Sequence, residues 1–511
     1  MDDHQREAAH GVLLHAAEEI MKGAPDGWRR ALVREYATPH GRGGTGSWYE
    51  TEGDGDSLSP SLDVRKLYEL VGGGEEVAVE LLVEPSGRFE AVVGRSLTRS
   101  RYERDRVLYV LRPDVLPEQP GALEPPCANP TFAGDPDEAV RLFREYLRKR
   151  REILEEEEWL AEPLTEDERA ALLDRFDGEL PPDLLALYGE ADGDEDTGLF
   201  HNHPWFALES TTLVEHEEPW SWGMNPLWST PGGTPPGVVR RWVGTPKWVP
   251  FATSTGGDFL AVDMDPGPAG RPGQVIRMGR NYGGAPMLVA PSVTHMLRAL
   301  VAALDRGAYR NDEGYLHVDA EFPSYLDPSK SFWRGNAPIP AKPKRIRHLV
   351  VDKVRDVDLS PVRNAPHLHA VTLFGDGPAD LAPLRDAPVE MLQAELGAVD
   401  LAPLAGHPAL RAVRLKTSEP VDLGVLRTLP RLQALDLSGS AVRDLGVLRE
   451  LDGLLSLTLS PEQWREVGAV PGLSAAELAG DPAPGQIREW AEGFRPDEPL
   501  DAPEYFEGSV R

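Results

Sequence analysis

The sequence predicts an α+β protein that ends in a solenoid of short repeats. Two observations favour the α+β class for residues 1–305: helix-like spacing of apolar residues and strand-like alternation follow one another there in short runs. A third observation separates the rest of the chain, where the dipeptide Asp-Leu recurs at intervals of 20 or 22 residues. The 511 residues leave room for three domains at about 150 residues each.

Residues 1–154 are predicted to form an α+β domain. Apolar residues recur at helical spacing over 5–21. Two alternating runs within 77–93 flank the turn sequence Glu-Pro-Ser-Gly, which is typical of a β-hairpin. A charged amphipathic helix over 137–154 is expected to close this domain.

Residues 160–305 are predicted to form a second α+β domain. Thr165 and Glu168 have the spacing of a capping box, in which each side chain bonds the other residue's backbone N–H at the start of a helix. Ser292 is placed to cap the last helix. Between these helices, alternation indicates three strands, at 247–252, 258–263 and 274–278.

Residues 306–343 are rich in Gly, Pro, Asp and Ser and are predicted to be a connector. Over 344–481, an apolar alternation precedes each Asp-Leu and a short apolar pair follows it, with the aspartates at Asp358, Asp380, Asp400, Asp422 and Asp444. This pattern resembles the leucine-rich repeat, in which one strand and one turn recur every 20–29 residues and stacked units share a core. We expect about five such units, followed by a frayed tail over 482–511.

The charge balance limits the classes of partner. The chain has 84 acidic and 53 basic residues and a net charge of -31. Binding to nucleic acid or to an anionic membrane surface is disfavoured, because both need positive charge on the protein. The sequence has no run of ~20 apolar residues and no secretory signal pattern, and its one cysteine, Cys127, allows no disulfide framework. A cytoplasmic protein with a protein partner is therefore expected.

Acidic charge is concentrated between residues 155 and 220, which hold 21 acidic and 2 basic residues, a local net charge of -19. One interpretation is a solvated face. The other is a docking surface for a basic protein, because a field of one sign accelerates association with a partner of opposite sign. Two tryptophans next to the acidic clusters are candidate anchors for such an interface. The predicted partner-binding residues are Asp192, Asp194, Glu195, Asp196, Glu215, Glu217, Glu218, Trp220 and Trp222.

Three motifs follow one another in the second domain: Leu180-Pro-Pro-Asp-Leu-Leu-Ala-Leu-Tyr188, Trp248-Val-Pro-Phe-Ala252 and Gly256-Gly-Asp258. Their order and spacing resemble the SUKH superfamily, which includes yeast cell-wall-assembly regulators and bacterial immunity proteins. The resemblance implies an α+β fold without catalysis and, in bacteria, neutralisation of a polymorphic toxin by direct binding. It also marks signature positions that we expect to define the fold, at Tyr188, Trp248, Pro250, Phe251, Gly257 and Asp258.

Residues 1–150 more loosely resemble a YezG-like immunity family, through the Ala24-Pro-Asp-Gly-Trp28 start, the hairpin and the closing helix. The leading hypothesis is therefore a non-catalytic bacterial immunity (antitoxin-like) protein that binds a basic toxin domain, with nucleases among the candidates. The alternative is a regulatory scaffold or adaptor related to the cell-wall-assembly regulators. No residue pattern predicts an enzyme, a cofactor or a metal site. His201, His203 and His216 have no fourth metal ligand at a suitable spacing, the contiguous triplet at 201–203 is not a catalytic motif, and no phosphate loop is present.

Overall fold

The computed structural model describes the chain except at residues 40, 53–55, 58–61, 72–75, 96, 100–104, 158, 177–178, 201–202, 213–224, 255, 283–285, 313–314, 321–330, 337, 355–356, 495–502 and 511. It contains two compact units. The first unit comprises Met1–Pro117, Glu218–Trp228 and Trp333–Arg511, and the second comprises Glu118–Glu217 and Ser229–Phe332. In the described part, no helix has both the length and the apolar character that a membrane span requires.

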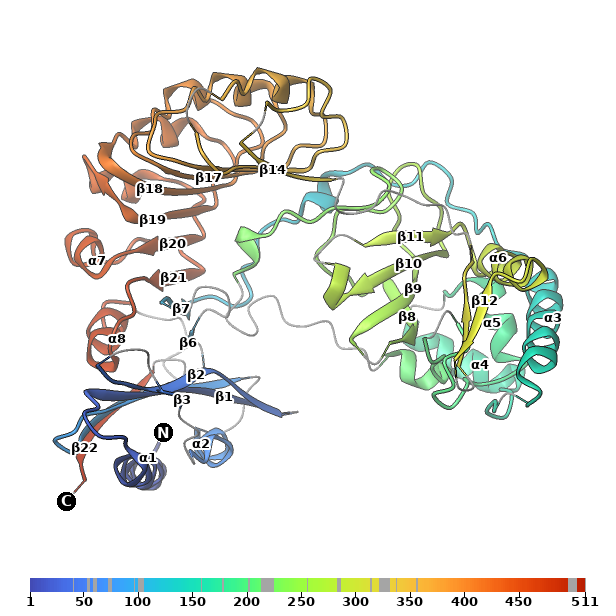
Figure 1. Ribbon diagram of the computed structural model, residues 1–511, viewed down its shortest axis with the longest axis horizontal. Coiled ribbons are helices and arrows are strands. Elements are labelled where there is room, and N and C mark those ends of the chain that lie inside the picture. The colour runs from blue at the N-terminus through green and yellow to red at the C-terminus, as the bar shows by residue number, and fades with distance from the viewer. Residues whose placement is uncertain are drawn as a thin grey trace. The chain divides into compact units, whose positions relative to one another are not determined.

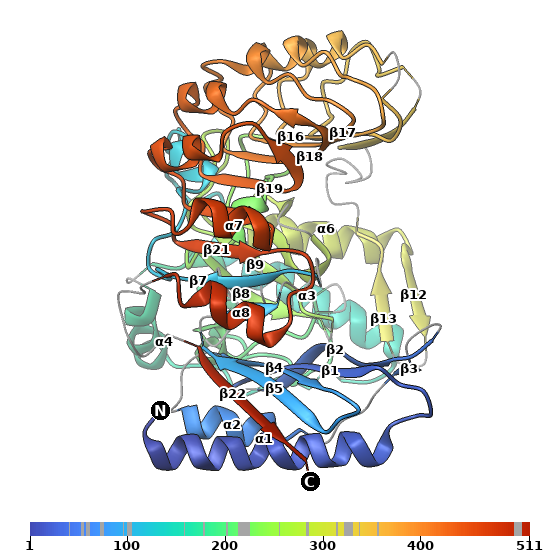
Figure 2. The ribbon, with the colours of Figure 1, turned by 90° about the vertical axis from the view of Figure 1, so that its left-hand side faces the viewer.

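The first unit begins with a six-stranded sheet in the order β22-β5-β4-β1-β2-β3, with two helices on one face (Figure 2). Asp2 and Gln5 form a capping box that starts the first helix. Alternate residues of β4, such as Val79 and Leu81, pack with Leu13 and Leu67 of the helices. The elements are α1 (Asp3–Gly23), β1 (Arg30–Thr38), β2 (Gly41–Glu50), β3 (Asp56–Ser57), α2 (Val64–Val71), β4 (Val77–Val83), β5 (Arg88–Gly94) and β22 (Glu504–Ser509).

A solenoid follows, and its strands form a ten-stranded sheet in the order β14-β15-β16-β17-β18-β19-β20-β21-β7-β6 (Figure 1). Strands β15 to β21 are parallel, whereas β7 is antiparallel to β21 and β6 is antiparallel to β7. The strands are β6 (Leu97–Arg99), β7 (Val107–Val110), β14 (Phe332–Gly335), β15 (His348–Val351), β16 (Ala370–Phe374), β17 (Met391–Leu396), β18 (Ala412–Val421), β19 (Ala434–Val442), β20 (Ser456–Leu459) and β21 (Ala475–Leu478).

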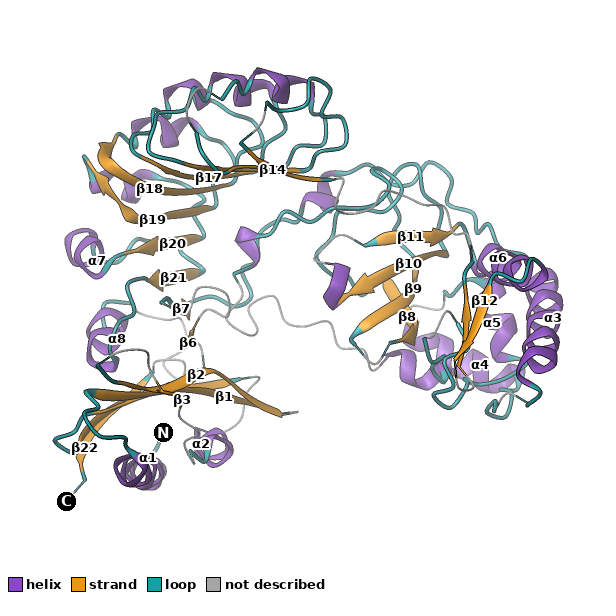
Figure 3. Cartoon of the chain, viewed as in Figure 1, coloured by secondary structure: helices purple, strands orange, loops and turns teal. Residues whose placement is uncertain are grey.

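The repeated Asp-Leu dipeptide has a direct structural explanation. Each aspartate accepts a hydrogen bond from the backbone N–H two residues later, at 2.8–2.9 Å, and so starts a short 3-10 helix. Each following leucine is buried in the solenoid core. These helices lie along the side of the solenoid opposite the strands (Figure 3), at Ser360–Asn364, Ala382–Asp386, Ala402–Leu404, Gly424–Thr428 and Leu445–Glu450.

The six-stranded sheet and the solenoid are joined within the first unit by a buried ionic cluster. Glu80 of β4 pairs with Arg99 of β6 and lies 3.6 Å from Nε of Arg34 of β1. Arg99 also bonds Asp481, which follows β21, at 3.0 Å. The side chains of Glu80, Arg34 and Arg99 are at most 4% exposed, so each buried charge has a partner of opposite sign.

The second unit has an antiparallel sheet in the order β11-β10-β9-β8, packed against helices. Thr165 and Glu168 form the expected capping box, and Ser292 accepts a hydrogen bond from the N–H of His295 at the start of α6. The elements are α3 (Pro136–Leu154), α4 (Glu166–Leu173), α5 (Pro182–Tyr188), β8 (Trp248–Thr253), β9 (Asp258–Asp263), β10 (Gln274–Gly279), β11 (Met287–Ala290), α6 (Val293–Asp305), β12 (Tyr309–Asp312) and β13 (Tyr315–Val318).

The structure corrects three of the predicted boundaries. Helix α3 does not close a domain over 1–154, because its apolar stripe packs against α5 and α6 in the core of the second unit. The predicted tail, 482–511, contains helix α8 (Pro484–Ala491), which packs next to helix α7 (Pro461–Val467), and strand β22, which pairs with β5. The predicted connector, 306–343, contains the β12-β13 hairpin and β14.

Candidate functional site

The predicted acidic cluster forms a turn whose first two carboxylates point inward. Asp192 Oδ1 accepts a hydrogen bond from the N–H of Leu208 at 2.7 Å, and Asp194 Oδ2 accepts one from the N–H of Leu199 at 2.7 Å. Burial raises the pKa of both carboxyls, while these hydrogen bonds lower it. Asp194 is fully buried, so its predicted place on an exposed docking surface is wrong. Its role in the structure is to satisfy backbone donors that the turn would leave unpaired.

Glu195 and Asp196 are the exposed part of this turn. Both have positive φ, 48° and 72°. Two backbone hydrogen bonds tie the turn to a neighbouring segment: Ala161 N–H donates to Gly193 O at 3.2 Å, and Asp192 N–H donates to Ala161 O at 3.4 Å. We call the exposed residues Trp159, Glu162, Glu195 and Asp196 the acidic edge.

Trp159 is 73% exposed, which is rare for so large an apolar side chain. The sequence interpretation missed it, although Trp159 directly follows a run of four glutamates. The remaining predicted partner-binding residues, Glu215, Glu217, Glu218, Trp220 and Trp222, lie outside the described residues.

The signature positions lie in and around the core of the second unit. Tyr188 is fully buried; its hydroxyl donates to Phe206 O at 3.1 Å and its ring lies 5.0 Å from that of Trp205. Trp248, Pro250 and Phe251 are buried on β8. Gly257 has φ 81° in the turn before β9, and Asp258 accepts hydrogen bonds from the N–H and the side-chain amide of Asn281 at 2.9 and 2.7 Å.

A second surface, which the sequence interpretation did not identify, lies on the face of the solenoid sheet away from the 3-10 helices. We call it the outer sheet face. The first outward-facing residues of the strands pair in register and include several small side chains, in the order Ala370, Met391, Ala412, Ala434, Ser456, Ala475 and Val110. In the sequence, an alanine recurs two residues before a polar residue in several of these strands, and this recurrence could have indicated the outer sheet face.

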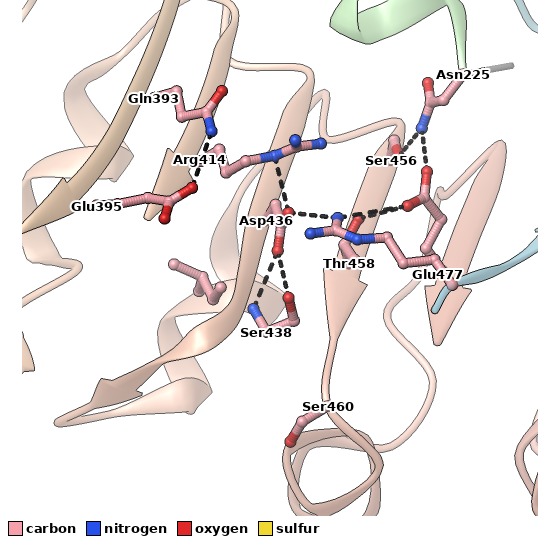
Figure 4. A network of polar contacts seen from close by, with 12 residues as sticks. Asn225, Gln393, Glu395, Arg414, Asp436, Ser438, Ser456, Thr458, Ser460 and Glu477 are labelled. Atoms are coloured by element: carbon pink, nitrogen blue, oxygen red, sulfur yellow. Dashed lines mark hydrogen bonds and ion pairs between the residues drawn. The ribbon is translucent and has the colours of Figure 1, made fainter. Parts of the chain in front are cut away.

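The next row on this face is polar, and its residues also pair across neighbouring strands (Figure 4): Gln393, Arg414, Asp436, Thr458 and Glu477. Asp436 lies between two arginines, since Arg414 Nε approaches its Oδ2 at 2.9 Å and Arg106 pairs with the same oxygen. Glu477 is 3% exposed, and burial raises its pKa although Asn225 and Arg106 lower it. The two buried carboxylates of this row are therefore balanced by the neighbouring arginines, Arg414 within the row and Arg106 next to it.

A short segment of the same unit, Asn225 to Trp228, contacts both rows. The amide of Asn225 donates to Ser456 Oγ at 2.7 Å and to Glu477 Oε1 at 2.9 Å. Leu227 is 1% exposed. Trp228 lies under the guanidinium of Arg414, with 4.6 Å between Cζ and the ring centroid.

Among the described residues, no cluster of three or more His, Cys, Asp or Glu side chains has the arrangement of a metal site. The triplet at 201–203 includes two residues outside the described part, and His203 is buried. Cys127 is half-buried and unpaired with another cysteine.

Comparison with known proteins concerns the second unit. Residues 163–299 match the SMI1 / KNR4 family (SUKH-1). The chain is 38% identical over 79 residues to a glucan synthesis regulatory protein of Neurospora crassa, which is 16% of this chain and 15% of that protein. It is 37% identical over 79 residues to a cell wall biosynthesis/cell cycle regulator of Schizosaccharomyces pombe, 16% of each chain. The match therefore spans about one sixth of these curated relatives.

Among solved structures, a similarity was found to an internalin from Listeria monocytogenes, with 20% sequence identity and a TM-score of 0.22, over 28% of this chain and 44% of that one.

The named relatives in the family are fungal regulators, which supports the regulatory alternative at the level of the family and does not specifically support toxin immunity. The chain therefore contains an SMI1 / KNR4 (SUKH-1) domain at residues 163–299, within an α+β architecture.

Proposed function

We propose that this protein is a non-catalytic regulatory adaptor of the cytoplasm that binds protein partners through its SMI1 / KNR4 domain. The observation that carries the proposal is the match over 163–299 to a family whose matching members are named as regulators of glucan synthesis and cell wall biosynthesis. Because the match covers one domain only, the regulated process is not transferred from those relatives. What we take from those relatives is the regulatory role alone, and the binding of protein partners is our proposal for how that role is carried out.

The acidic edge supports a basic partner. Trp159 offers a large apolar surface, and Glu162, Glu195 and Asp196 offer exposed carboxylates on the two segments that the backbone hydrogen bonds of Ala161 join. An arginine-rich surface would complement such an arrangement, since arginine stacks on tryptophan and pairs with carboxylates. The expected effect of the carboxylates is on the association rate and its salt dependence, because exposed charges contribute little to affinity at physiological ionic strength.

The experiment that tests the adaptor proposal is reconstitution with partners identified by cross-linking in the source cells. An adaptor is expected to hold two different polypeptides in one complex, which light scattering measures as a ternary mass. If only one partner binds, with a 1:1 stoichiometry, and a growth assay shows that binding abolishes the toxicity of this partner, the adaptor proposal is contradicted and immunity is favoured instead.

Charge variants of the full chain test the acidic edge. The double variant Glu195→Gln with Asp196→Asn removes two carboxylates, and asparagine tolerates the positive φ at position 196. The matched control, Glu156→Gln with Asp319→Asn, removes the same charge from two exposed positions of the second unit that are not part of the acidic edge. Trp159→Ala removes the aromatic surface. We expect the turn variant to flatten the salt dependence of association, and Trp159→Ala to raise the dissociation rate at all salt concentrations.

If both charge variants change association equally, only the net charge matters and the acidic edge is not the docking surface. Unchanged binding by Trp159→Ala likewise removes the tryptophan from the proposed interface.

A further inference from the structure

The segment Asn225–Trp228 is held on the outer sheet face by side chains, in the way that a protein holds a bound peptide. No hydrogen bond of a β-ladder joins it to the sheet among the described residues. Its contacts come instead from one amide, one leucine and one tryptophan, together with a backbone carbonyl: Leu227 O accepts a hydrogen bond from Arg411 Nη1 at 3.2 Å. Recognition through side chains at fixed spacing is selective for sequence.

The surface under Leu227 is formed by residues whose small size leaves room for it. Leu227 belongs to one hydrophobic cluster with five buried side chains, which we call the alanine patch: Leu108, Val110, Ala412, Ala434 and Ala475. Alanine at the same register position on β18, β19 and β21 provides a shallow apolar surface that a leucine side chain covers. Larger residues at these positions would occupy that space themselves.

Asn225, on the other side of Pro226 from Leu227, is bound by two polar side chains of the outer sheet face. Ser456 and Glu477 both accept hydrogen bonds from the Asn225 amide group (Figure 4). Glu477 Oε2 also accepts a hydrogen bond from the Thr458 hydroxyl and lies 3.8 Å from Arg106 Nη1. These contacts orient the carboxylate independently of the Asn225 amide. A carboxylate held in this way selects a donor such as an amide over an acceptor.

The fit of the chain's own segment is incomplete at Trp228. Its indole Nε1 is buried, and it has no hydrogen-bond acceptor within the part of the chain that the structure describes. A buried donor without an acceptor weakens the contact that buries it. A competing segment that places a similar ring under Arg414 and satisfies or lacks this donor would bind the same surface more tightly.

We propose that the outer sheet face is a recognition site for a linear segment with asparagine followed two and three residues later by leucine and an aromatic residue, that residues 225–228 occupy it in cis, and that a protein partner carrying such a segment replaces them. The alanine patch takes the leucine, Glu477 and Ser456 take the amide, and Arg414 stacks on the aromatic ring. This site is independent of the proposed adaptor function of the SMI1 / KNR4 domain.

The test uses the full chain and a fluorescein-labelled peptide with the sequence of residues 223–230, with binding measured by fluorescence anisotropy. In the emptied variant, Asn225→Ala, Leu227→Ala and Trp228→Ala remove the side chains that occupy the site. The emptied variant is expected to bind the peptide at least about tenfold more tightly than the wild type, because the cis segment competes at high effective concentration. A peptide with alanine in place of the three side chains is the ligand control.

Two further variants locate the binding in the emptied background. Ala434→Leu fills the alanine patch and is expected to weaken peptide binding at least about tenfold. Gln393→Leu adds the same side chain to a half-buried position of the same face that is not part of the hydrophobic cluster around Leu227, and binding should stay unchanged. Circular dichroism checks that each variant is folded.

A folded emptied variant that fails to bind the peptide, or that binds it no better than the wild type does, overturns the proposal. Equal binding by the Ala434→Leu and Gln393→Leu variants also overturns it, because the peptide would then sit elsewhere.

Discussion

Asp263 offers the sharpest prediction about pH. It ends β9 with no solvent exposure, and it accepts hydrogen bonds from Gln274 Nε2 at 2.9 Å and from the N–H of Asp265 at 3.1 Å. Burial raises the pKa of its carboxyl to about 7, and the two hydrogen bonds lower it only in part. The folded chain therefore binds this proton more tightly than the unfolded chain, whose aspartates have a pKa of about 3.9.

This difference in pKa sets the direction and the size of the change in the free energy of unfolding with pH. The second unit loses stability as the pH rises from about 4 through about 7 and regains it when the pH falls. At about 1.4 kcal/mol for each pKa unit, the ionised carboxylate costs about 4 kcal/mol at high pH, of which about 3 kcal/mol is recovered between pH 8 and pH 5. Asp263→Asn imitates the neutral carboxyl and should remove this part of the pH dependence.

Hydrogen exchange by mass spectrometry measures the effect where it arises. Peptides covering β9 and β10 of the wild type should gain protection between pH 8 and pH 5, after correction for intrinsic exchange, and Asp263→Asn should not show that gain. The comparison between the two proteins cancels the titration of the other acidic groups. If both proteins show the same pH dependence, Asp263 is ionised throughout and the reasoning from burial is refuted.

Three further predictions concern stability. Glu80→Gln removes one carboxylate that two buried arginines share and leaves them with Asp481. It should destabilise the first unit by about 3 kcal/mol, measured by exchange of β4, and no loss of protection would show that Asp481 is enough to hold these arginines. Tyr188→Phe removes the hydrogen bond to Phe206 O and should cost about 1 kcal/mol by urea unfolding of the second unit, whereas an unchanged midpoint would mean that the bond contributes nothing. Asp400→Ala removes the cap of one 3-10 helix and should lower the melting temperature of the solenoid by roughly 2–4 °C; the exposed Asp452→Ala is the control and should have no effect.

Local chemistry made parts of the fold predictable. The capping box of Thr165 and Glu168 and the cap at Ser292 depend on residues within one helical turn, and the structure contains both. The Asp-Leu period was visible because each aspartate bonds a backbone N–H only two residues away. Patterns of this kind involve residues only a few positions apart, so a single sequence is enough to find them.

Long-range pairing was not predictable in the same way. Strand β22 was taken for part of a frayed, proline-containing tail, and its two aromatic residues, Tyr505 and Phe506, are adjacent and so do not show the alternation of a half-buried strand. Their partner, β5, lies about 400 residues earlier, and the pairing of Phe506 with Ala91 exists only in the folded chain. Helix α3 shows the same limit: its apolar stripe was recognised in the sequence, but the domain against which the stripe packs was not.

The candidate site was predictable only in composition. Four acidic residues in sequence gave no sign that Asp194 turns inward while Asp196 stays exposed, because that distinction depends on the backbone donor of Leu199. The outer sheet face depends on strands spaced along more than a hundred residues, and its ligand-like segment comes from a different part of the chain.

Closure of the solenoid by β7 has a consequence for the order of folding. A ribosome makes residues 107–110 some 360 residues before Ala475–Leu478, the strand on which they pair. Repeats can add to one another as they emerge, since each needs only its predecessor, but the closing hairpin must wait until the last repeat exists. We therefore expect the exposed apolar side chains of Val107 and Tyr109 to be the part of the nascent chain that most needs a chaperone, and their docking to be among the last steps of assembly.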